Sequence, residues 1–326
     1  MMYKFNKKDP KPCPLCNSND LTEVSNIDRN GNPLKTDMCQ SCGHVFSNPP
    51  PKRKDLELFY KKNYRADYKG TLHPKKKHIL RSGQRAIERY KQIKPYLENK
   101  DKILEIGSGS GEFLFLLQEK GYTIKGVEPN VGFAEFSKKN YNLDILVDKL
   151  EKVSIERSQW DFIFLYHVLE HLLDPIESLK HISGMLSQDG FLNLEVPNIE
   201  AKFHSPKRLF HFAHLHNFSL EGLVFSLNKA NLGVIKIKIM PKTEHINIIC
   251  KKKNLEAEQP KCVVVKRINK HLLSYNTYGD ILSFRPYLRF FDNFKRPIKE
   301  YFNLMALGYS HKPPTLLRKL FKKNNL

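Results

Sequence analysis

Residues 103–113 read ILEIGSGSGEF, and this stretch decides the fold of the chain. An apolar run is followed by three glycines at alternate positions and then by the start of a helical pattern. Glycine lets the backbone turn sharply and approach a ligand closely. The following helix would direct free N–H groups and a partial positive charge into the turn. The stretch therefore predicts a buried strand, a ligand-binding turn and a helix.

Residues 101–253 repeat this pattern, because short apolar runs alternate with helical segments from KILEIG to GFLNLEVP. Such alternation is typical of βαβ units on a parallel sheet. The last two runs, GVIKIKIM and HINIICKK, are separated by PKTE and predict a terminal hairpin. We therefore expect an α/β fold whose last strand is antiparallel, unlike a symmetric dinucleotide fold.

The acids around the turn indicate the kind of ligand. A dinucleotide motif requires glycine at the position of Glu112. Glu105 favours a ligand with a positive amino group, and Glu128, about twenty residues on, is placed to accept hydrogen bonds from ribose hydroxyls. Asp148 ends the third strand and would meet an adenine amino group, although any strand-end acid can instead cap a helix. The predicted cofactor-binding residues are Glu105, Gly107, Gly109, Gly111, Glu128, Asp148 and Tyr166.

The stretch LEIGSGSGEF resembles the first motif of class I S-adenosylmethionine (SAM)-dependent methyltransferases, and GVEPN resembles its ribose-binding continuation. The resemblance extends through WDFIFLYHVLEHLLDP and GFLNLEVPN. It implies a Rossmann-like seven-stranded methyltransferase sheet with an antiparallel last strand. It also implies SAM as the cofactor and methyl transfer as the activity.

The predicted acceptor side of the site begins where the fourth strand ends, at His167, Glu170 and His171. A histidine there is matched to proton transfer at neutral pH. The alternative is that Glu170 and His171 cap the next helix. Similar quinone methyltransferases carry an ExxEH form that holds magnesium, whereas this chain has HxxEH, so we expect no metal in this loop.

A second group of histidines follows the fifth strand. HLHNFSLEGL resembles the H-x-x-x-F-[ST] stretch that borders the substrate cavity in these methyltransferases, which places His216 first among the acceptor contacts. The histidine spacing matches no common zinc pattern. The histidines of this group are His204, His211, His214 and His216. The predicted catalytic residues are His167, Glu170, His171 and His216.

Two CxxC pairs near the start of the chain, Cys13–Cys16 and Cys39–Cys42, are separated by 22 residues. This spacing predicts a tetrahedral structural Zn²⁺ site with four thiolates and no open position. The run CQSCGHVFSNPPPKRKDLELFYKKNY resembles methyltransferases with an N-terminal zinc ribbon, many of which act on deoxysugars or surface-glycan precursors.

We expect four parts: a zinc ribbon at 1–50, connecting and lid helices at 51–99, the methyltransferase domain at 100–253, and a basic, mostly helical C-terminal extension at 254–326. Tyr60, Tyr64 and Tyr68 would belong to the lid. The net charge of +21 favours an anionic partner. The basic extension is a candidate for peripheral contact with an anionic membrane, and packing on the sheet is the alternative.

The sequence favours methylation of a sugar nucleotide or lipid-linked glycan precursor. An RNA (rRNA) methyltransferase is the main alternative, because a CPLC ribbon and a basic surface also suit nucleic acid. A quinone-type O-methyltransferase and a non-enzymatic zinc-ribbon scaffold are further alternatives. The start of the chain lacks an apolar leader segment, and we expect a cytoplasmic protein.

Overall fold

The computed structural model describes residues 10–58, 74–153, 155–202, 205–253, 257–274, 277–283, 285–308 and 311–326. The chain divides into two compact units. Unit 1 joins residues 1–59 to 165–286, and unit 2 joins residues 60–164 to 287–326. The four parts expected from the sequence remain a prediction. His204 and the lid tyrosines Tyr60, Tyr64 and Tyr68 lie outside the described residues.

A seven-stranded sheet has the order β10-β11-β8-β7-β4-β5-β6. Its strands are β4 (Lys102–Ile106), β5 (Thr123–Val127), β6 (Ile145–Leu146), β7 (Trp160–Tyr166), β8 (Leu186–Val196), β10 (Leu232–Ile239) and β11 (Ile246–Lys252). β5 is parallel to both β4 and β6, whereas β11 is antiparallel to β8 and β10. The predicted Rossmann-like methyltransferase sheet with an antiparallel last strand is confirmed.

The central strand β7 is mostly apolar because helices cover both faces of such a sheet. In β7, Phe162, Phe164 and Leu165 are fully buried. The helices before and between the strands in chain order are α1 (Arg53–Leu58), α3 (Lys76–Ile93), α4 (Glu112–Glu119), α5 (Val131–Tyr141), α6 (Pro175–Met185) and α7 (Leu220–Lys229). Asn130 caps α5 by accepting a hydrogen bond from the Phe133 N–H.

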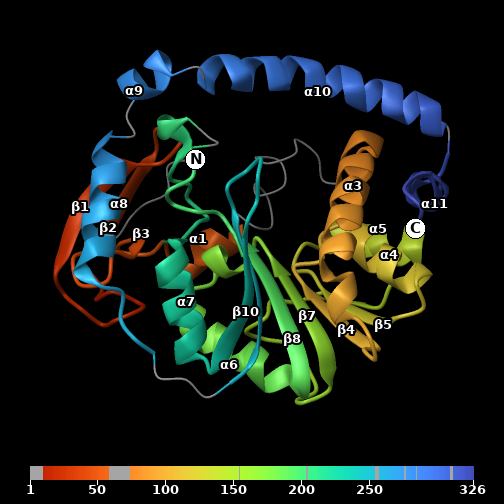
Figure 1. Ribbon diagram of the computed structural model, residues 1–326, viewed down its shortest axis with the longest axis horizontal. Helices are drawn as coiled ribbons and strands as arrows, with labels where there is room; N and C mark the ends of the chain where they lie inside the picture. Colours follow the sequence, from red (N-terminus) through yellow and green to blue (C-terminus); the bar gives the residue numbers. More distant parts are fainter. Residues whose placement is uncertain are drawn as a thin grey trace. The chain divides into compact units, whose positions relative to one another are not determined.

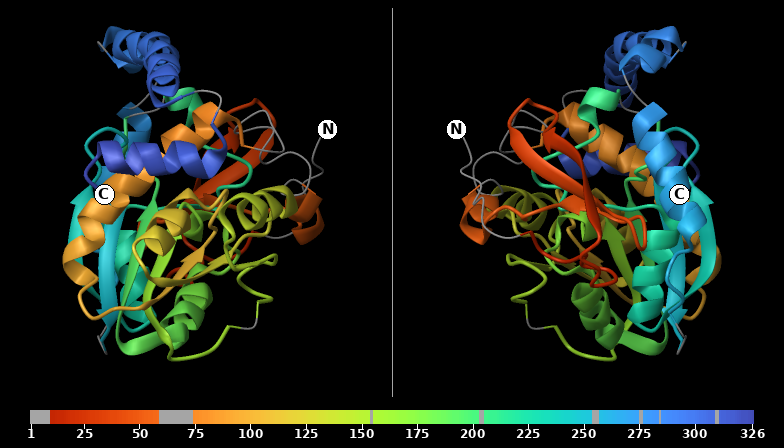
Figure 2. Two further views of the ribbon diagram at one scale, coloured as in Figure 1. Left: turned by 90° about the vertical axis from the view of Figure 1, so that its right-hand side faces the viewer. Right: turned by 90° about the vertical axis from the view of Figure 1, so that its left-hand side faces the viewer.

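The C-terminal extension is helical, as expected, and consists of α8 (Cys262–Ser274), α9 (Thr277–Leu282), α10 (Arg285–Leu307) and α11 (Pro313–Lys323). Within unit 2, α11 lies beside α3 (Figures 1 and 2). Gly83 of α3 makes room for Leu317 and Leu320, since a Cβ at Gly83 would lie 2.5 and 2.9 Å from their methyl carbons. α11 is therefore part of the packed unit rather than a tail.

Helix α10 has a strongly one-sided pattern. The side chain of Glu300 pairs with Arg81 of α3 at 2.7 Å, and Leu304 and Leu307 are buried. The opposite face carries large apolar side chains that are between 46% and 67% exposed: Tyr287, Phe290, Phe291, Phe294, Ile298, Tyr301, Phe302 and Met305. None of the helices in the described ranges is both long enough and apolar enough to cross a bilayer.

Unit 1 contains a second, four-stranded sheet with the order β1-β2-β3-β9. Its strands are β1 (Leu21–Ile27), β2 (Pro33–Cys39), β3 (Val45–Ser47) and β9 (His216–Asn217). Helix α8 runs alongside this sheet (Figure 1) and buries Val264, Val265 and Ile268 against Met38 and Val45. The N-terminal strands β2 and β3 thus share a hydrophobic core with helix α8, which follows the large sheet in the chain.

Candidate functional site

The glycine turn after β4 takes the conformation that the sequence predicts. Gly107, Gly109 and Gly111 all have positive φ, between 58° and 83°. A Cβ at Gly111 would lie 2.6 Å from Leu143 Cδ1 and 2.8 Å from Ser137 Cβ, so this position has no room for a side chain. Helix α4 starts directly after the turn, and its free N–H groups are therefore available to a ligand carboxylate.

Glu128 follows β5 and faces the same turn. Its carboxylate accepts hydrogen bonds from the Gly109 N–H at 2.7 Å and from the Asn130 N–H at 2.9 Å. The side chain is only 3% exposed. These two bonds fix the carboxylate beside the turn, where its remaining lone pairs are able to accept hydrogen bonds from ribose hydroxyls.

Glu105 is a buried acid at 3% exposure, and its Oε2 atom accepts no hydrogen bond from the residues that the structure describes. Burial raises its pKa to about 8, Glu112 and Glu128 add to the rise, and the charge of Arg89 opposes it. Ionisation of a buried acid with an unbonded oxygen is unfavourable unless a ligand supplies a cation or a donor. The ammonium group of SAM is such a donor, so this residue fits the predicted cofactor.

Two other predicted cofactor residues have local partners. Asp148 is half-buried and accepts a hydrogen bond from the N–H of Lys149 at 2.8 Å. The hydroxyl of Tyr166 donates to the amide oxygen of Asn193 on β8. The polar atom of Tyr166 is therefore used within the sheet, and the cofactor role of both residues remains a prediction.

Histidine and glutamate side chains gather in unit 1 after β7. His167 directly follows β7, with φ at 56°, and its Nε2 lies 3.0 Å from Glu195 Oε1. Its Nδ1 lies 3.6 Å from Glu170 Oε1. Burial by itself would lower the pKa of His167, but the Glu195 bond, the close contact with Glu170 and the charges of both carboxylates outweigh it and raise the pKa to about 9. His167 is therefore protonated at neutral pH.

Glu170 and His171 lie in the short 3₁₀ turn Leu169–His171. Glu170 is 1% exposed, and within the described ranges neither of its carboxylate oxygens accepts a hydrogen bond. His171 Nδ1 lies 2.7 Å from the carbonyl oxygen of Ala213, while its Nε2 lies 3.8 Å from Glu170 Oε1. Neither residue caps α6, because Asp174 accepts the capping bond from the Glu177 N–H.

The histidines after β8 divide into two groups. His214 packs edge to face on His171 with ring centroids 4.8 Å apart, and His211 packs on His214. His216 points elsewhere: its Nε2 bonds to the Leu172 carbonyl at 2.9 Å and its Nδ1 lies 3.1 Å from His44 Nε2. Both nitrogens of His216 are therefore occupied, and burial lowers its pKa to about 4.

Two residues beside His167, Glu195 and His245, were not predicted from the sequence as site residues. Glu195 lies near the carboxyl end of β8, and His245 immediately precedes β11. His245 Nδ1 lies 3.6 Å from Glu195 Oε1. The sequence could have indicated Glu195 as a site residue, because it lies near the end of a predicted strand. No sequence motif marks His245, which lies in the hairpin before β11.

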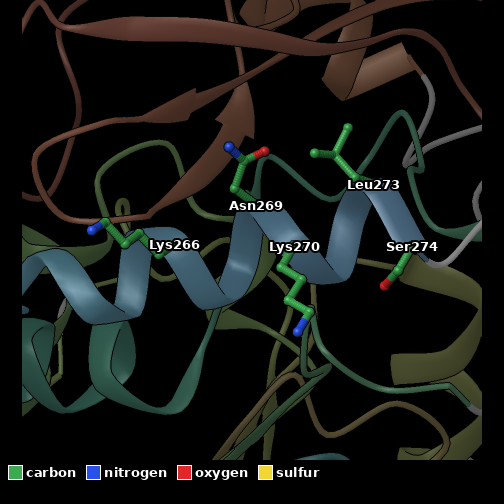
Figure 3. A pocket seen from close by; sticks show the side chains of 5 residues that line it. All are labelled: Lys266, Asn269, Lys270, Leu273 and Ser274. Atoms are coloured by element: carbon green, nitrogen blue, oxygen red, sulfur yellow. The ribbon is translucent and has the colours of Figure 1, made fainter.

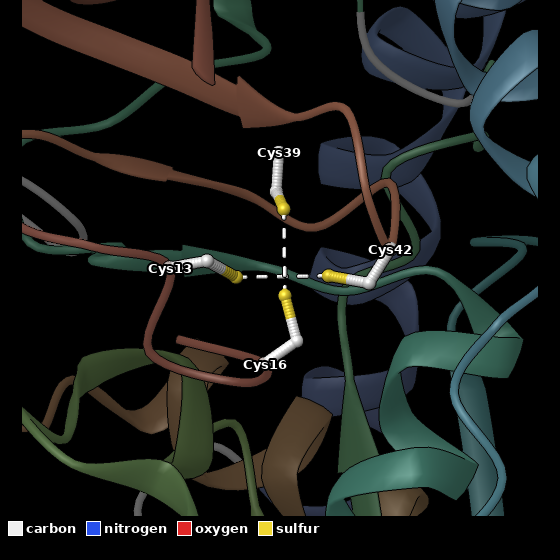
Figure 4. Close-up of side chains that lie close together, drawn as sticks. All are labelled: Cys13, Cys16, Cys39 and Cys42. Atoms are coloured by element: carbon white, nitrogen blue, oxygen red, sulfur yellow. Dashed lines mark hydrogen bonds between the residues drawn. The ribbon is translucent and has the colours of Figure 1, made fainter. Parts of the chain in front are cut away.

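The four cysteines of the CxxC pairs converge in unit 1, as Figure 4 shows. The sulfur atoms of Cys13 and Cys42 are 3.6 Å apart, and those of Cys16 and Cys39 are 3.5 Å apart. A tetrahedral zinc with Zn–S bonds of about 2.3 Å separates its sulfur ligands by about 3.8 Å. The four thiols therefore fit a zinc ion with little movement.

A surface hollow lies on α8, in a part of the sequence that contains none of the predicted cofactor-binding or catalytic residues. It is lined by Lys266, Asn269, Lys270, Leu273 and Ser274, and Figure 3 shows the two lysines one turn apart. Both lysines are exposed. The hollow offers positive charge but no enclosed cofactor site.

Residues 77–237 match the family described as the methyltransferase domain. This region contains the glycine turn, Glu105 and Glu128, as well as the cluster after β7 except His245. The chain thus carries a methyltransferase domain, which confirms the predicted enzyme class and supports SAM as the cofactor.

Curated relatives match only part of the chain. Over 122 residues the chain is 30% identical to the tRNA U34 carboxymethyltransferase of Campylobacter fetus, covering 34% of this chain and 42% of the relative. A protein of the same name from Nautilia profundicola is 32% identical over 124 residues, covering 36% of this chain and 41% of the relative. The chain spans less than half the length of these relatives.

Solved structures also align with the chain. A SAM-dependent methyltransferase from Methanosarcina mazei has a TM-score of 0.43 and 21% identity, covering 50% of this chain and 97% of its own. The 1,6-didemethyltoxoflavin-N1-methyltransferase of Burkholderia thailandensis has a TM-score of 0.46 and 14% identity, covering 64% of this chain and 96% of its own.

Proposed function

We propose that the chain transfers a methyl group from SAM to an RNA acceptor. The partial identity to proteins named tRNA U34 carboxymethyltransferases supports RNA over the glycan that the sequence favoured. The net charge of +21 agrees with a polyanionic partner. Cofactor binding rests on one observation above others, the buried carboxyl group of Glu105 next to the glycine turn, whose Oε2 has no hydrogen-bond partner among the described residues.

The residues of unit 2 would hold the cofactor. The N–H groups at the start of α4 bind the carboxylate of its methionine moiety, Glu105 binds its ammonium group, and Glu128 accepts hydrogen bonds from its ribose. Because SAM is itself the methyl donor, these residues serve mainly to position it. In-line methyl transfer requires the acceptor atom roughly 3 to 3.5 Å from the methyl carbon.

The cluster after β7 would serve the acceptor. Glu195 orients His167 through Nε2. Because the pKa of His167 is raised to about 9, the ring carries a proton at neutral pH and would act as a base for an acceptor hydroxyl only in its deprotonated fraction, which grows as pH rises toward 9. His167 is also the most exposed of the clustered side chains that form ion pairs, with 32% of its side chain accessible. Methylation of an oxygen is therefore the chemistry that this cluster suits best.

The exposed face of α8 would contact the RNA backbone, because Lys266 and Lys270 project from it without competing acids at the hollow. Each phosphate contact contributes to binding and to its salt dependence. Arg267, between them, is instead held by Glu200 and Glu221 at 2.8 and 2.6 Å.

The test is transfer of label from methyl-labelled SAM to total RNA, with the purified full chain. We expect labelled RNA, and we expect Lys270→Glu to weaken RNA binding and flatten its salt dependence. The matched control is Lys251→Glu, a charge reversal at an exposed position on β11. Absence of label in RNA, or equal binding by both variants, contradicts the RNA proposal.

A glycan precursor is the second candidate. The resemblance of the cysteine-rich N-terminus to glycan-modifying methyltransferases supports it, and so does the pairing of β3 with β9, which joins that region to the predicted acceptor loop. The same assay distinguishes the candidates if sugar nucleotides replace RNA. A scaffold without chemistry would bind SAM and label neither.

We also propose that Cys13, Cys16, Cys39 and Cys42 hold a structural zinc ion. The four thiols are close enough for tetrahedral ligation and leave no position open for a substrate. Removal of the metal should destabilise the β1-β2-β3-β9 sheet, because the cysteines pack with Phe46 and Phe225 in one apolar cluster. A cytoplasmic location also remains a proposal.

A further inference from the structure

We propose that Glu170, His171 and His214 form a second metal site, which binds a divalent transition ion such as Zn²⁺. The three side chains each offer one ligand atom, and these atoms lie within 4.8 Å of one another. The proposal reverses the expectation, drawn from the HxxEH motif, that this loop holds no metal. It is independent of which acceptor the enzyme uses.

The first argument is the environment of Glu170. Its carboxylate is 1% exposed, and no group in the described part of the chain donates a hydrogen bond to either oxygen. Among the described residues its ion-pair partners are the rings of His167 and His171, both at one oxygen, Oε1. A buried carboxylate in this state requires positive charge nearby. The His167 ring supplies it only from 3.6 Å, whereas a metal ion held with His171 and His214 would supply it directly.

The second argument is the length of these contacts. The Nδ1 of His167 and the Nε2 of His171 lie 3.6 and 3.8 Å from Glu170 Oε1, too far for a hydrogen bond. Two ligands of one tetrahedral zinc ion, with bonds of about 2.05 Å, are separated by about 3.3 Å. The spacing between His171 and Glu170 is therefore closer to that of two metal ligands than to that of a shared proton.

The third argument is the orientation of His171. Its Nδ1 faces the carbonyl oxygen of Ala213 at 2.7 Å, so the ring must donate its proton there. The neutral ring then presents the lone pair of Nε2 to the Glu170 side. Metal-binding histidines are held in this way, with the second nitrogen bonded to a carbonyl or carboxylate.

The donor set indicates the class of metal. Mg²⁺ and Ca²⁺ prefer oxygen ligands, whereas two imidazoles and one carboxylate suit Zn²⁺ or Fe²⁺. Three protein ligands leave at least one position for water or an acceptor oxygen. The neighbouring group of His167, Glu195 and His245 is also compact, but Glu195 already bonds His167 at 3.0 Å. We therefore assign the metal to the group that contains Glu170.

The experiment measures zinc bound per full-length chain after equilibration with Zn²⁺ and removal of excess metal. We expect two zinc ions in the unsubstituted chain and one in Glu170→Gln and His214→Ala, with the affinity of the second site at least about 100-fold weaker. Glu177→Gln, an exposed acid on α6, is the matched control and should keep two. Cys13→Ser should lose the thiolate site but retain the second.

Replacement of zinc by Co²⁺ distinguishes the two sites, because only the cysteine site gives thiolate charge-transfer absorption. One zinc in the unsubstituted chain overturns the proposal and assigns Glu170 to an ion pair with the histidines. Loss of the second ion from His245→Ala but not from Glu170→Gln overturns the choice of group. If Glu170→Gln does not fold, His214→Gln and His214→Ala decide the question.

Discussion

Replacement of Glu105 by Gln tests how the buried acid recognises the cofactor. With a pKa raised to about 8 from the ordinary 4.5, the Glu105 carboxyl is about 90% protonated at pH 7. The ammonium group of SAM requires the ionised form. Binding at pH 7 should therefore release about 0.9 proton per SAM, and affinity should rise about tenfold, or about 1.4 kcal/mol, between pH 6 and pH 7.

Isothermal titration calorimetry in buffers of different ionisation enthalpy measures this proton release. Glu105→Gln should remove both the release and the pH dependence, while Glu135→Gln, an exposed acid on α5, should keep them. Because the folded-state pKa of Glu105 is raised, its contribution to the free energy of unfolding of the SAM-free protein should fall as pH rises from about 4.5 to about 8. Proton release near zero in the unsubstituted chain, or equal release in Glu105→Gln, refutes this reasoning.

Three further predictions concern packing, metal and surface. Gly111→Ala should abolish SAM binding and lower the free energy of unfolding by about 1 to 3 kcal/mol more than Gly121→Ala, because Gly121 shares the positive φ but has no atom within 4 Å of its Cβ position; equal thermal shifts would contradict the clash. Chelation of zinc, or Cys13→Ser, should lower the melting temperature of the β1-β2-β3-β9 sheet without removing SAM binding by unit 2, as thermal unfolding and calorimetry would measure; unchanged melting would argue against a structural ion. The exposed aromatic face of α10 and its basic flanks should bring the chain down with anionic vesicles, and Phe294→Glu should reduce this sedimentation severalfold; equal sedimentation with neutral vesicles would argue against an anionic surface.

Local signals predicted most of the large sheet. Strand and helix periods are properties of a few neighbouring residues, so the alternation from KILEIG onward identified β4 to β8, and the PKTE break identified the antiparallel hairpin. The glycine turn and Glu128 were also predictable, because both follow strands at known positions. The spacing of the two CxxC pairs likewise predicted that four thiols distant in the sequence lie close together.

Long-range pairing was not predictable from the same signals. β9 contributes only His216 and Asn217 to the small sheet, and two residues have no period. The bond between His44 and His216 joins positions 172 residues apart, which no local pattern indicates. The burial of Glu170 was also not predictable, because it depends on the loop after β8, which is distant in the sequence and packs beside this turn.

The central claim is that the turn after β4, together with Glu105 and Glu128, binds SAM. Equilibrium dialysis of labelled SAM against the purified, zinc-loaded chain tests it most directly. We predict one SAM per chain, displaced by S-adenosylhomocysteine, and loss of binding in a folded Glu128→Ala variant. An unsubstituted, folded chain that retains no SAM would contradict the account.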